Sequence, residues 1–355
     1  MKEFIHTFSL QTKLHSSQKD EIQKAFREDF FYNSQENILV LSKYAAHGVR
    51  IEMNYTTAEE KRYDKQHRDC KIKTIITPAK LLHPNEPMSR LFTPEEYRQA
   101  CERLRDIFKE IEITSGVKLW NEVKFKRIDI AKDVKTESEH YSQEVIRMAK
   151  KALHKTGYHI WTPSAEDIEK TGWAEEDSVL YNNHNQEVEA KIYNKIADME
   201  KRGYDTENLK GLLRFELTLK RKYLYAKGFL SDEHLNFDDL PVLLGRIVDQ
   251  AAVLLHTHLV SPLWSGAMLH KDWQKKYIKI YCKSKTARRD NMMAYRRSAN
   301  RYGVFEDEPT MVKHFEAAGV SPLYLNGDIR YIPSFSDLLA GTRNERVERF
   351  LQLHS

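Results

Sequence analysis

Three short segments of the chain carry residue types that can act on a phosphate ester. In the segment 191–195, Tyr193 stands two residues from a lysine on either side. The segments 126–131 and 213–217 each contain an arginine followed two residues later by an acid. A tyrosine hydroxyl can attack phosphorus, lysines neutralise phosphate charge, and carboxylates hold divalent cations. Together these groups are what the breaking and rejoining of a DNA phosphodiester without ATP requires.

The two segments with an arginine and an acid have the pattern of strands. Side chains alternate between faces in a strand, so Arg127 shares a face with Asp129, and Arg214 shares one with Glu216. If the strands are neighbours, Asp129 and Glu216 converge on one divalent cation, and their oxygen ligands suit Mg²⁺ or Mn²⁺. Both acids are expected on an open polar face. The alternative is that each acid pairs with an arginine at a sheet edge.

Tyr193 is the candidate nucleophile. Lys191, Tyr193 and Lys195 share one face at the end of a predicted hairpin strand. A free phenol, with a pKa of about 10, attacks poorly at neutral pH, and a nearby cation or metal lowers that pKa. Attack would join DNA to the tyrosine and free a 3′-hydroxyl that can later reseal the strand. The alternative is a packing role, since the chain has 18 tyrosines.

Hydrophobic periodicity predicts a chain rich in strands, with helices placed between them. Thr93 as N-cap, Pro94 after it and Glu96 at the third helical position form a capping box that starts one helix. Strands are expected at 2–10, 37–42, 48–55, 71–76, 123–134, 179–182, 188–193 and 212–221, and further helices at 138–155 and 195–202. We expect an α+β fold with a largely antiparallel sheet and packed helices, forming a catalytic domain over residues 1–228.

Residues 229–355 are expected to form a helical, basic region that binds DNA. Apolar spacing predicts helices at 240–258, 284–302, 309–318 and 334–353. Between residues 271 and 301, eleven lysines and arginines stand against two aspartates. The expected phosphate contacts are Lys285, Arg288, Arg289, Arg296, Arg297 and Arg301, together with Arg127 and Arg214 of the sheet. The alternative is a charged helix that only meets solvent.

Composition narrows the class of protein. The 355 residues carry a formal net charge of +5, and no apolar run is long enough to span a membrane. The N-terminus lacks the apolar core of a signal peptide, so a soluble cytoplasmic protein is expected. Three distant cysteines indicate neither a disulfide framework nor a thiolate zinc site. Without a glycine-rich phosphate loop, ATP-driven unwinding must come from a partner.

Several segments, taken in order, resemble a known family. The segments are 77–82, 127–129, 191–195, 213–216 with 222–224, and a basic stretch at 295–302. In this order they resemble the gene-two replication initiators of filamentous phages, over about residues 35 to 305. The hairpin that carries Tyr193 also resembles the trans-acting Rep proteins of rolling-circle plasmids and related conjugative nicking enzymes. The fold that this resemblance implies is related to the HUH endonucleases.

The resemblance implies a rolling-circle replication initiator, which nicks one strand at a phage or plasmid origin and rejoins it through a 5′-phosphotyrosine. Tyr193 then becomes the nucleophile, and Lys195 and Lys191 become its cationic neighbours. Asp129 and Glu216 take roles at a Mg²⁺ or Mn²⁺ ion. The implied partners are double-stranded origin DNA, single-stranded DNA, and a helicase and DNA polymerase of a bacterial host, with no membrane.

His83 is a third expected metal ligand, in a place where the chain departs from the family. The phage proteins continue to Gly-His-Asn, whereas residues 83–86 read His-Pro-Asn-Glu. A different class of function also fits the sequence, namely a non-catalytic DNA-binding replication or regulatory protein. A covalent adduct between protein and DNA would distinguish the nickase from the non-catalytic DNA-binding protein. The sequence alone does not reveal the origin sequence, the oligomeric state or the phage or plasmid source. It also does not reveal whether a second tyrosine such as Tyr181 takes part.

Overall fold

The structure is a computed structural model of the chain. It describes residues 2–54, 69–86, 88–120, 123–135, 139, 142–143, 146, 149, 159–161, 178–182, 187–207, 209, 211–231, 234–255, 258–259, 284–286, 288–290 and 292–293. The chain divides into two compact units. One unit consists of Phe4–Ile130 and Thr218–Ala251, and we call it the β1 unit after its strand β1 (Phe4–His15). The other consists of Met1–Glu3, Ala131–Leu217 and Ala252–Ser355, and we call it the Tyr193 unit. Two strands, β6 (Lys124–Lys135) and β10 (Leu212–Lys220), supply residues to both units.

The β1 unit is an antiparallel sheet with helices packed on it. Its strands follow the order β2 (Phe30–Asn33), β3 (Ile38–Leu41), β4 (Val49–Asn54), β5 (Asp69–Ile76), β1 (Phe4–His15), β6 and β10. Its helices are α1 (Ser16–Ala25), α3 (Pro78–Leu82), α4 (Pro94–Ser115), α8 (Arg221–Ala226) and α9 (Leu240–Leu255), with 3₁₀ turns η1 (Arg27–Asp29), η2 (Ala45–His47) and η4 (Phe237–Asp239). Antiparallel registers pair β2 with β3, β3 with β4, β4 with β5, and β5 with β1.

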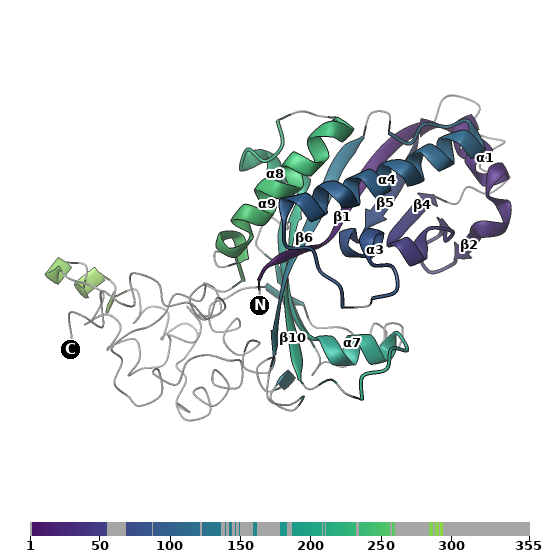
Figure 1. Cartoon of the computed structure of the whole chain (residues 1–355). Coiled ribbons are helices and arrows are strands. Elements are labelled where there is room, and N and C mark those ends of the chain that lie inside the picture. Colours follow the sequence, from purple (N-terminus) through teal and green to yellow (C-terminus); the bar gives the residue numbers. More distant parts are fainter. Residues whose placement is uncertain are drawn as a thin grey trace. The chain divides into compact units, whose positions relative to one another are not determined.

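The longest helix of this unit, α4, starts and ends as the sequence dictates. Thr93 and Glu96 form the expected capping box, and Gly116, with a φ of 75°, ends the helix in the left-handed region. The buried ring of Tyr97 ties the helix to β1, since its hydroxyl accepts from the Ile5 amide at 2.8 Å and donates to the Leu91 carbonyl at 2.8 Å. Figure 1 shows α4 lying along the sheet.

A single glycine sets the approach of η2 to the start of α3. Gly48 has a φ of 74°, and a Cβ there would lie 2.8 Å from the Thr77 carbonyl oxygen. The Thr77 amide donates to the Gly48 carbonyl at 2.8 Å. Only glycine fits this close backbone contact at a positive φ.

The Tyr193 unit has its own part of the antiparallel sheet. Strand order runs from β6 to β10, β9 (Val188–Asn194), β8 (Ser178–Asn182) and β7 (His159–Trp161). Strands β8 and β9 form an antiparallel pair in which Ser178 faces Tyr193 and Leu180 faces Lys191. Helix α7 (Lys195–Lys201) follows β9 directly.

These elements confirm the expected fold class, an α+β fold with a largely antiparallel sheet. The helix expected at 240–258 corresponds to α9. The described residues of the expected helix 284–302 include helical positions. The helices expected at 309–318 and 334–353 lie outside the described residues. By their contacts, α8 and the part of α9 up to Ala251 belong to the β1 unit. These segments lie on both sides of the expected boundary at residue 228, and that boundary stays a prediction. Among the described helices, none is both long and apolar enough to span a membrane.

Candidate active site

Tyr193 lies where β9 gives way to α7. The next residue, Asn194, is the N-cap of α7, and its side-chain oxygen accepts from the amides of Ile196 and Ala197 at 3.1 and 3.3 Å. The amide nitrogen of the same side chain donates to Glu139 at 3.0 Å. A strand that ends in a capping residue therefore fixes the backbone directly beside the tyrosine.

The hydroxyl of Tyr193 donates to a carboxylate oxygen of Glu216 at 3.0 Å. Glu216 comes from β10, the strand next to β9 in the sheet order. Tyr193 is only 3% exposed. Burial above all, and then the negative charge of Glu216, raise the pKa of Tyr193 well above its ordinary value. This is opposite to the lowered pKa that the sequence pattern led us to expect, because the charge of Arg214, which lowers the pKa, does not outweigh desolvation.

Both predicted lysines lie near the ring of Tyr193. The ammonium nitrogen of Lys191 is 4.5 Å from the ring centroid, and that of Lys195 is 5.9 Å from it. Burial is the main reason that the pKa of Lys191 is lowered. Burial, and next the charge of Arg214, lower the pKa of Lys195 to about 8. Two cations thus stand beside the phenol, one of them with a pKa close to neutrality.

An acid that the sequence patterns did not reveal holds Lys195 in place. Asp198, one turn along α7, accepts from Lys195 at 2.5 Å and from Arg202 at 2.9 Å. Burial alone would raise the pKa of Asp198, but Lys195 and Arg202 hold it below its ordinary value. The spacing of three residues on a helix was the signal that could have found this pair.

Arg214 and Asp133 form a buried, bidentate ion pair. Two guanidinium nitrogens of Arg214 donate to the two oxygens of Asp133 at 2.6 and 2.8 Å. Arg214 is 3% exposed. Burial alone would lower its pKa, but the charges of Tyr193, Asp133 and Glu216 raise it. The guanidinium that we expected to contact phosphate is thus engaged with Asp133 in this conformation.

Asp129 lies in the β1 unit, where it has its own partners. It accepts from the hydroxyl of Thr218 at 2.6 Å and from the hydroxyl of Thr7, and Arg127 lies 3.3 Å away. Asp129 is 2% exposed, so the expectation that it stands on an open polar face is wrong. A carboxylate can be buried here because hydroxyls and a guanidinium satisfy it.

The described residues do not assemble a metal site. Among them there is no group of three or more histidine, cysteine, aspartate or glutamate side chains placed to share an ion. His83 directly follows α3, while Asp129 and Glu216 bind hydroxyl groups. This donor set does not fit a divalent cation in this conformation. The Mg²⁺ or Mn²⁺ requirement stays a prediction of the resemblance.

The predicted DNA-binding residues of the C-terminal region are described only in part. Lys285, Arg288 and Arg289 are exposed on a helical stretch, and Arg289 lies 3.3 Å from Asp290. Arg296, Arg297 and Arg301 lie outside the described residues.

Tyr181, the second tyrosine considered, has a structural environment. It is fully buried on β8, and its hydroxyl donates to the Leu259 carbonyl at 2.7 Å. This hydroxyl donates to a main-chain carbonyl, whereas that of Tyr193 donates to a carboxylate.

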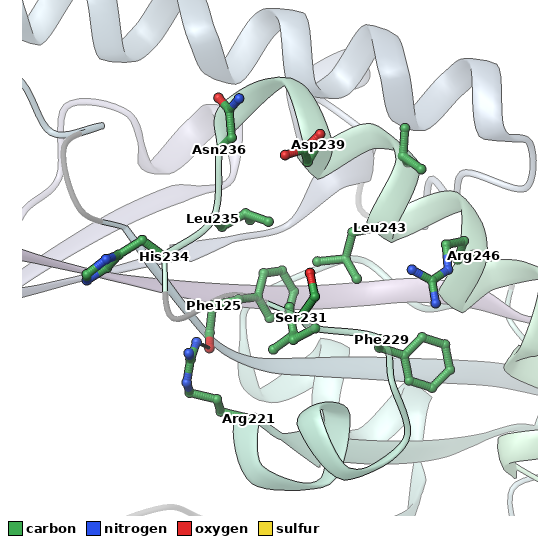
Figure 2. A pocket seen from close by; sticks show the side chains of 12 residues that line it. Phe125, Arg221, Phe229, Ser231, His234, Leu235, Asn236, Asp239, Leu243 and Arg246 are labelled. Carbon is green, nitrogen blue, oxygen red and sulfur yellow. Dashed lines mark hydrogen bonds between the residues drawn. The ribbon is translucent and has the colours of Figure 1, made fainter.

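A separate pocket of about 280 Å³ lies within the β1 unit, between β6 and the segment from α8 to α9 (Figure 2). Its buried lining includes Phe125, Phe229 and Leu243, and the side chains of Arg221 and Arg246 lie toward opposite sides. Arg246 donates to the Gly228 carbonyl at 2.9 Å. None of the residues around Tyr193 lines this pocket.

Comparison with known proteins adds little to this geometry. No family model and no curated protein matches the chain. Among solved structures, the chain is similar to a rolling circle replication initiator protein from Geobacillus stearothermophilus, over 72% of this chain and 85% of that one. The sequence identity is 13% and the TM-score is 0.34. A likeness this weak assigns neither fold nor function.

Proposed function

We propose that this protein is a rolling-circle replication initiator, a site-specific DNA nickase and strand-joining transesterase with Tyr193 as its nucleophile. One observation carries the proposal: the Tyr193 hydroxyl donates to Glu216, and two lysines lie beside its ring. A nucleophile, a proton acceptor and cations are the groups that phosphoryl transfer to a tyrosine needs. The order of the motifs along the sequence supports the same function.

In the proposed step, the phenol oxygen of Tyr193 attacks a backbone phosphorus in line with the bond to the 3′-oxygen. The new bond joins oxygen to phosphorus, and the bond that breaks releases the 3′-oxygen. Glu216 accepts the phenol proton and then gives a proton to the 3′-oxygen. The products are a 5′-phosphotyrosine and a 3′-hydroxyl, and the reverse attack reseals the strand.

The cations stabilise the charge that develops during this step. Lys191 lies nearer to the ring than Lys195 does, so it is the residue that we assign to the phosphate oxygens. Lys195 and Arg214 are each held by an aspartate, and we assign them to positioning and to the local field. Because Tyr193 is almost fully buried, the reaction requires the residues around its hydroxyl to move so that DNA can reach it.

The same proposal implies a set of partners. The substrates would be double-stranded origin DNA and the single strand released from it. A host helicase and a DNA polymerase would supply the unwinding and synthesis, since the sequence contains no glycine-rich phosphate loop of its own. The site of action would be the cytoplasm of a bacterial host.

One observation favours a second candidate, a non-catalytic DNA-binding replication or regulatory protein. The burial of Tyr193 and its raised pKa are also what a tyrosine with a purely structural role would have. In that case, the bond to Glu216 would satisfy a buried hydroxyl and do nothing more.

Incubation with a supercoiled replicon that carries the origin tests the proposal. We expect an open circle with a single nick at one position when Mg²⁺ or Mn²⁺ is present, and none with a chelator. Retarded but uncut DNA at every metal concentration would instead support the second candidate.

A further inference from the structure

Lysines gather on neighbouring strands of the β1 unit. Strand β1 lies between β5 and β6 in the sheet order. In the register between β1 and β5, Lys13 stands directly opposite Lys71, and both side chains are exposed. The next lysine of β5, Lys73, bonds to Glu52 at 2.9 Å.

The lysines of β6 point to the same face of the sheet. Phe8 of β1 stacks on Phe125 of β6 in the core, with ring centroids 5.8 Å apart. Because side chains alternate along a strand, Lys124 and Lys126 lie opposite the Phe125 ring, as Lys13 lies opposite that of Phe8. We call the group of Lys13, Lys71, Lys124 and Lys126 the lysine face.

Arg221 adds a guanidinium at the border of this face. It opens α8, just after β10, and donates to the main-chain carbonyl of Phe125 at 3.1 Å, beside which Figure 2 draws it. Burial first, and then the charges of Arg221, Lys71 and Lys124, lower the pKa of Lys126. Cations of β5, β6 and α8 are therefore close enough to repel one another.

Like charges that face each other across a sheet repel one another and weaken its pairing. The repulsion disappears when an anion with regularly spaced charges covers the surface. A DNA backbone has that property, and binding it releases counterions.

We infer that the lysine face binds the phosphate backbone of DNA independently of sequence. The inference rests on the proposed function only for its choice of DNA as the polyanion. The location of the lysine face does not depend on the proposed chemistry, because the lysine face belongs to the β1 unit and Tyr193 belongs to the other unit. The face carries phosphate contacts and no base readout, so it adds affinity on any duplex.

A salt titration of DNA binding tests this inference. The probe is a labelled duplex of arbitrary sequence without an origin, and the full-length protein is compared with the double variant Lys71→Gln and Lys126→Gln. The slope of log K against log salt should flatten by roughly 0.9 for each lost contact. The matched control is Lys24→Gln with Lys109→Gln, which removes two exposed lysines from α1 and α4 of the same unit.

The control should keep the slope of the wild type, although its net charge is lowered equally. An unchanged slope in the lysine-face variant, or an equal loss in the control, would overturn the inference. Binding by a Tyr193→Phe variant should match the wild type in this assay. If the lysine-face variant shows the flattened slope but the wild type does not nick the origin, the result would count against the proposed chemistry and leave the lysine face standing.

The stability of a Lys126→Gln variant distinguishes a DNA-binding role of Lys126 from a structural role. Replacing Lys126 removes repulsion with Arg221, Lys71 and Lys124, so Lys126→Gln should unfold at an equal or higher urea concentration than the wild type. The same variant should bind DNA more weakly. If Lys126→Gln lost stability and affinity together, the side chain would be supporting the fold, and its assignment to DNA binding would be wrong.

Discussion

Charge is arranged differently around Tyr193 and on the lysine face. Around Tyr193 the buried charges face opposite charges: Arg214 faces Asp133, and Lys195 faces Asp198. On the lysine face, Lys71 stands opposite Lys13 on exposed sheet surface. Buried charges need partners because desolvation is costly, whereas exposed like charges cost less and maintain a field outside the protein. The first arrangement suits fixed geometry and chemistry, and the second suits long-range attraction of an anion.

Removing the Tyr193 hydroxyl should distinguish the roles of the two regions most clearly, because it should affect nicking and not DNA affinity. We expect Tyr193→Phe to abolish nicking, because phenylalanine has no oxygen to attack phosphorus, while affinity for DNA is retained. The control is Tyr181→Phe, which also removes a buried tyrosine hydroxyl but leaves Tyr193 intact. Nicking of a supercoiled replicon is measured on gels. Full activity in Tyr193→Phe would remove this residue from the mechanism.

The next largest effect concerns the proton acceptor. In Glu216→Gln the amide oxygen can still accept from Tyr193, but it cannot take up the proton, so the nicking rate should fall by about 10² to 10⁴. Glu200→Gln, an exposed position of α7 in the same unit, is the control and should keep the wild-type rate. Single-turnover rates with saturating DNA give the comparison. Equal rates for the two variants would show that Glu216 is not the base.

Stability should reveal the difference between buried and exposed pairs. Asp133→Asn leaves the buried Arg214 without its anion and should cost about 3 to 5 kcal/mol of unfolding free energy. Glu102→Gln breaks an exposed pair with Arg98, 2.5 Å long, and should cost no more than about 1 kcal/mol. Urea unfolding of both variants measures the contrast. Similar losses would mean that the pair at Arg214 is not desolvated as its burial implies.

The smallest effect is a pH dependence that originates at Lys195. Its pKa in the folded protein is about 8, below the ordinary value of 10.5. Between these values the unfolded chain holds a proton that the folded protein has lost, so unfolding free energy rises with pH in this window. Relative to a Lys195→Met variant, the wild type should therefore gain stability between about pH 8 and 10. If the unfolding free energies of the two proteins changed with pH in parallel, a lowered pKa of Lys195 in the folded protein would be ruled out.

Much of the fold could be predicted because strands leave a clear period of two. The hairpin of β8 and β9, the strands β6 and β10, and the capping box of α4 were all visible in the sequence. Helix α1 was missed because its N-cap is His15, with Gln18 completing the capping box, and histidine is not among the residues typical of that position.

The site was harder to predict than the fold. Alternation assigns a face to each side chain, but it does not say which strands become neighbours. Since β9 lies beside β10, Glu216 meets Tyr193 there, and Asp129 has hydroxyl partners and Arg127 in the other unit. The alternative of an acid paired with an arginine thus describes Asp129 in part. Burial, which sets the pKa of Tyr193, depends on tertiary packing that local patterns do not contain.

Covalent attachment of Tyr193 to DNA is the central expectation for this protein. The direct measurement is mass spectrometry of the protein after reaction with a single strand that contains the nick site, followed by nuclease and trypsin. Trypsin cuts after Lys191 and Lys195, so a nucleotide is expected on the tetrapeptide 192–195, attached at its only tyrosine. The same nucleotide on a peptide without Tyr193, or nicked DNA with no modified peptide, would contradict the proposed role of this residue.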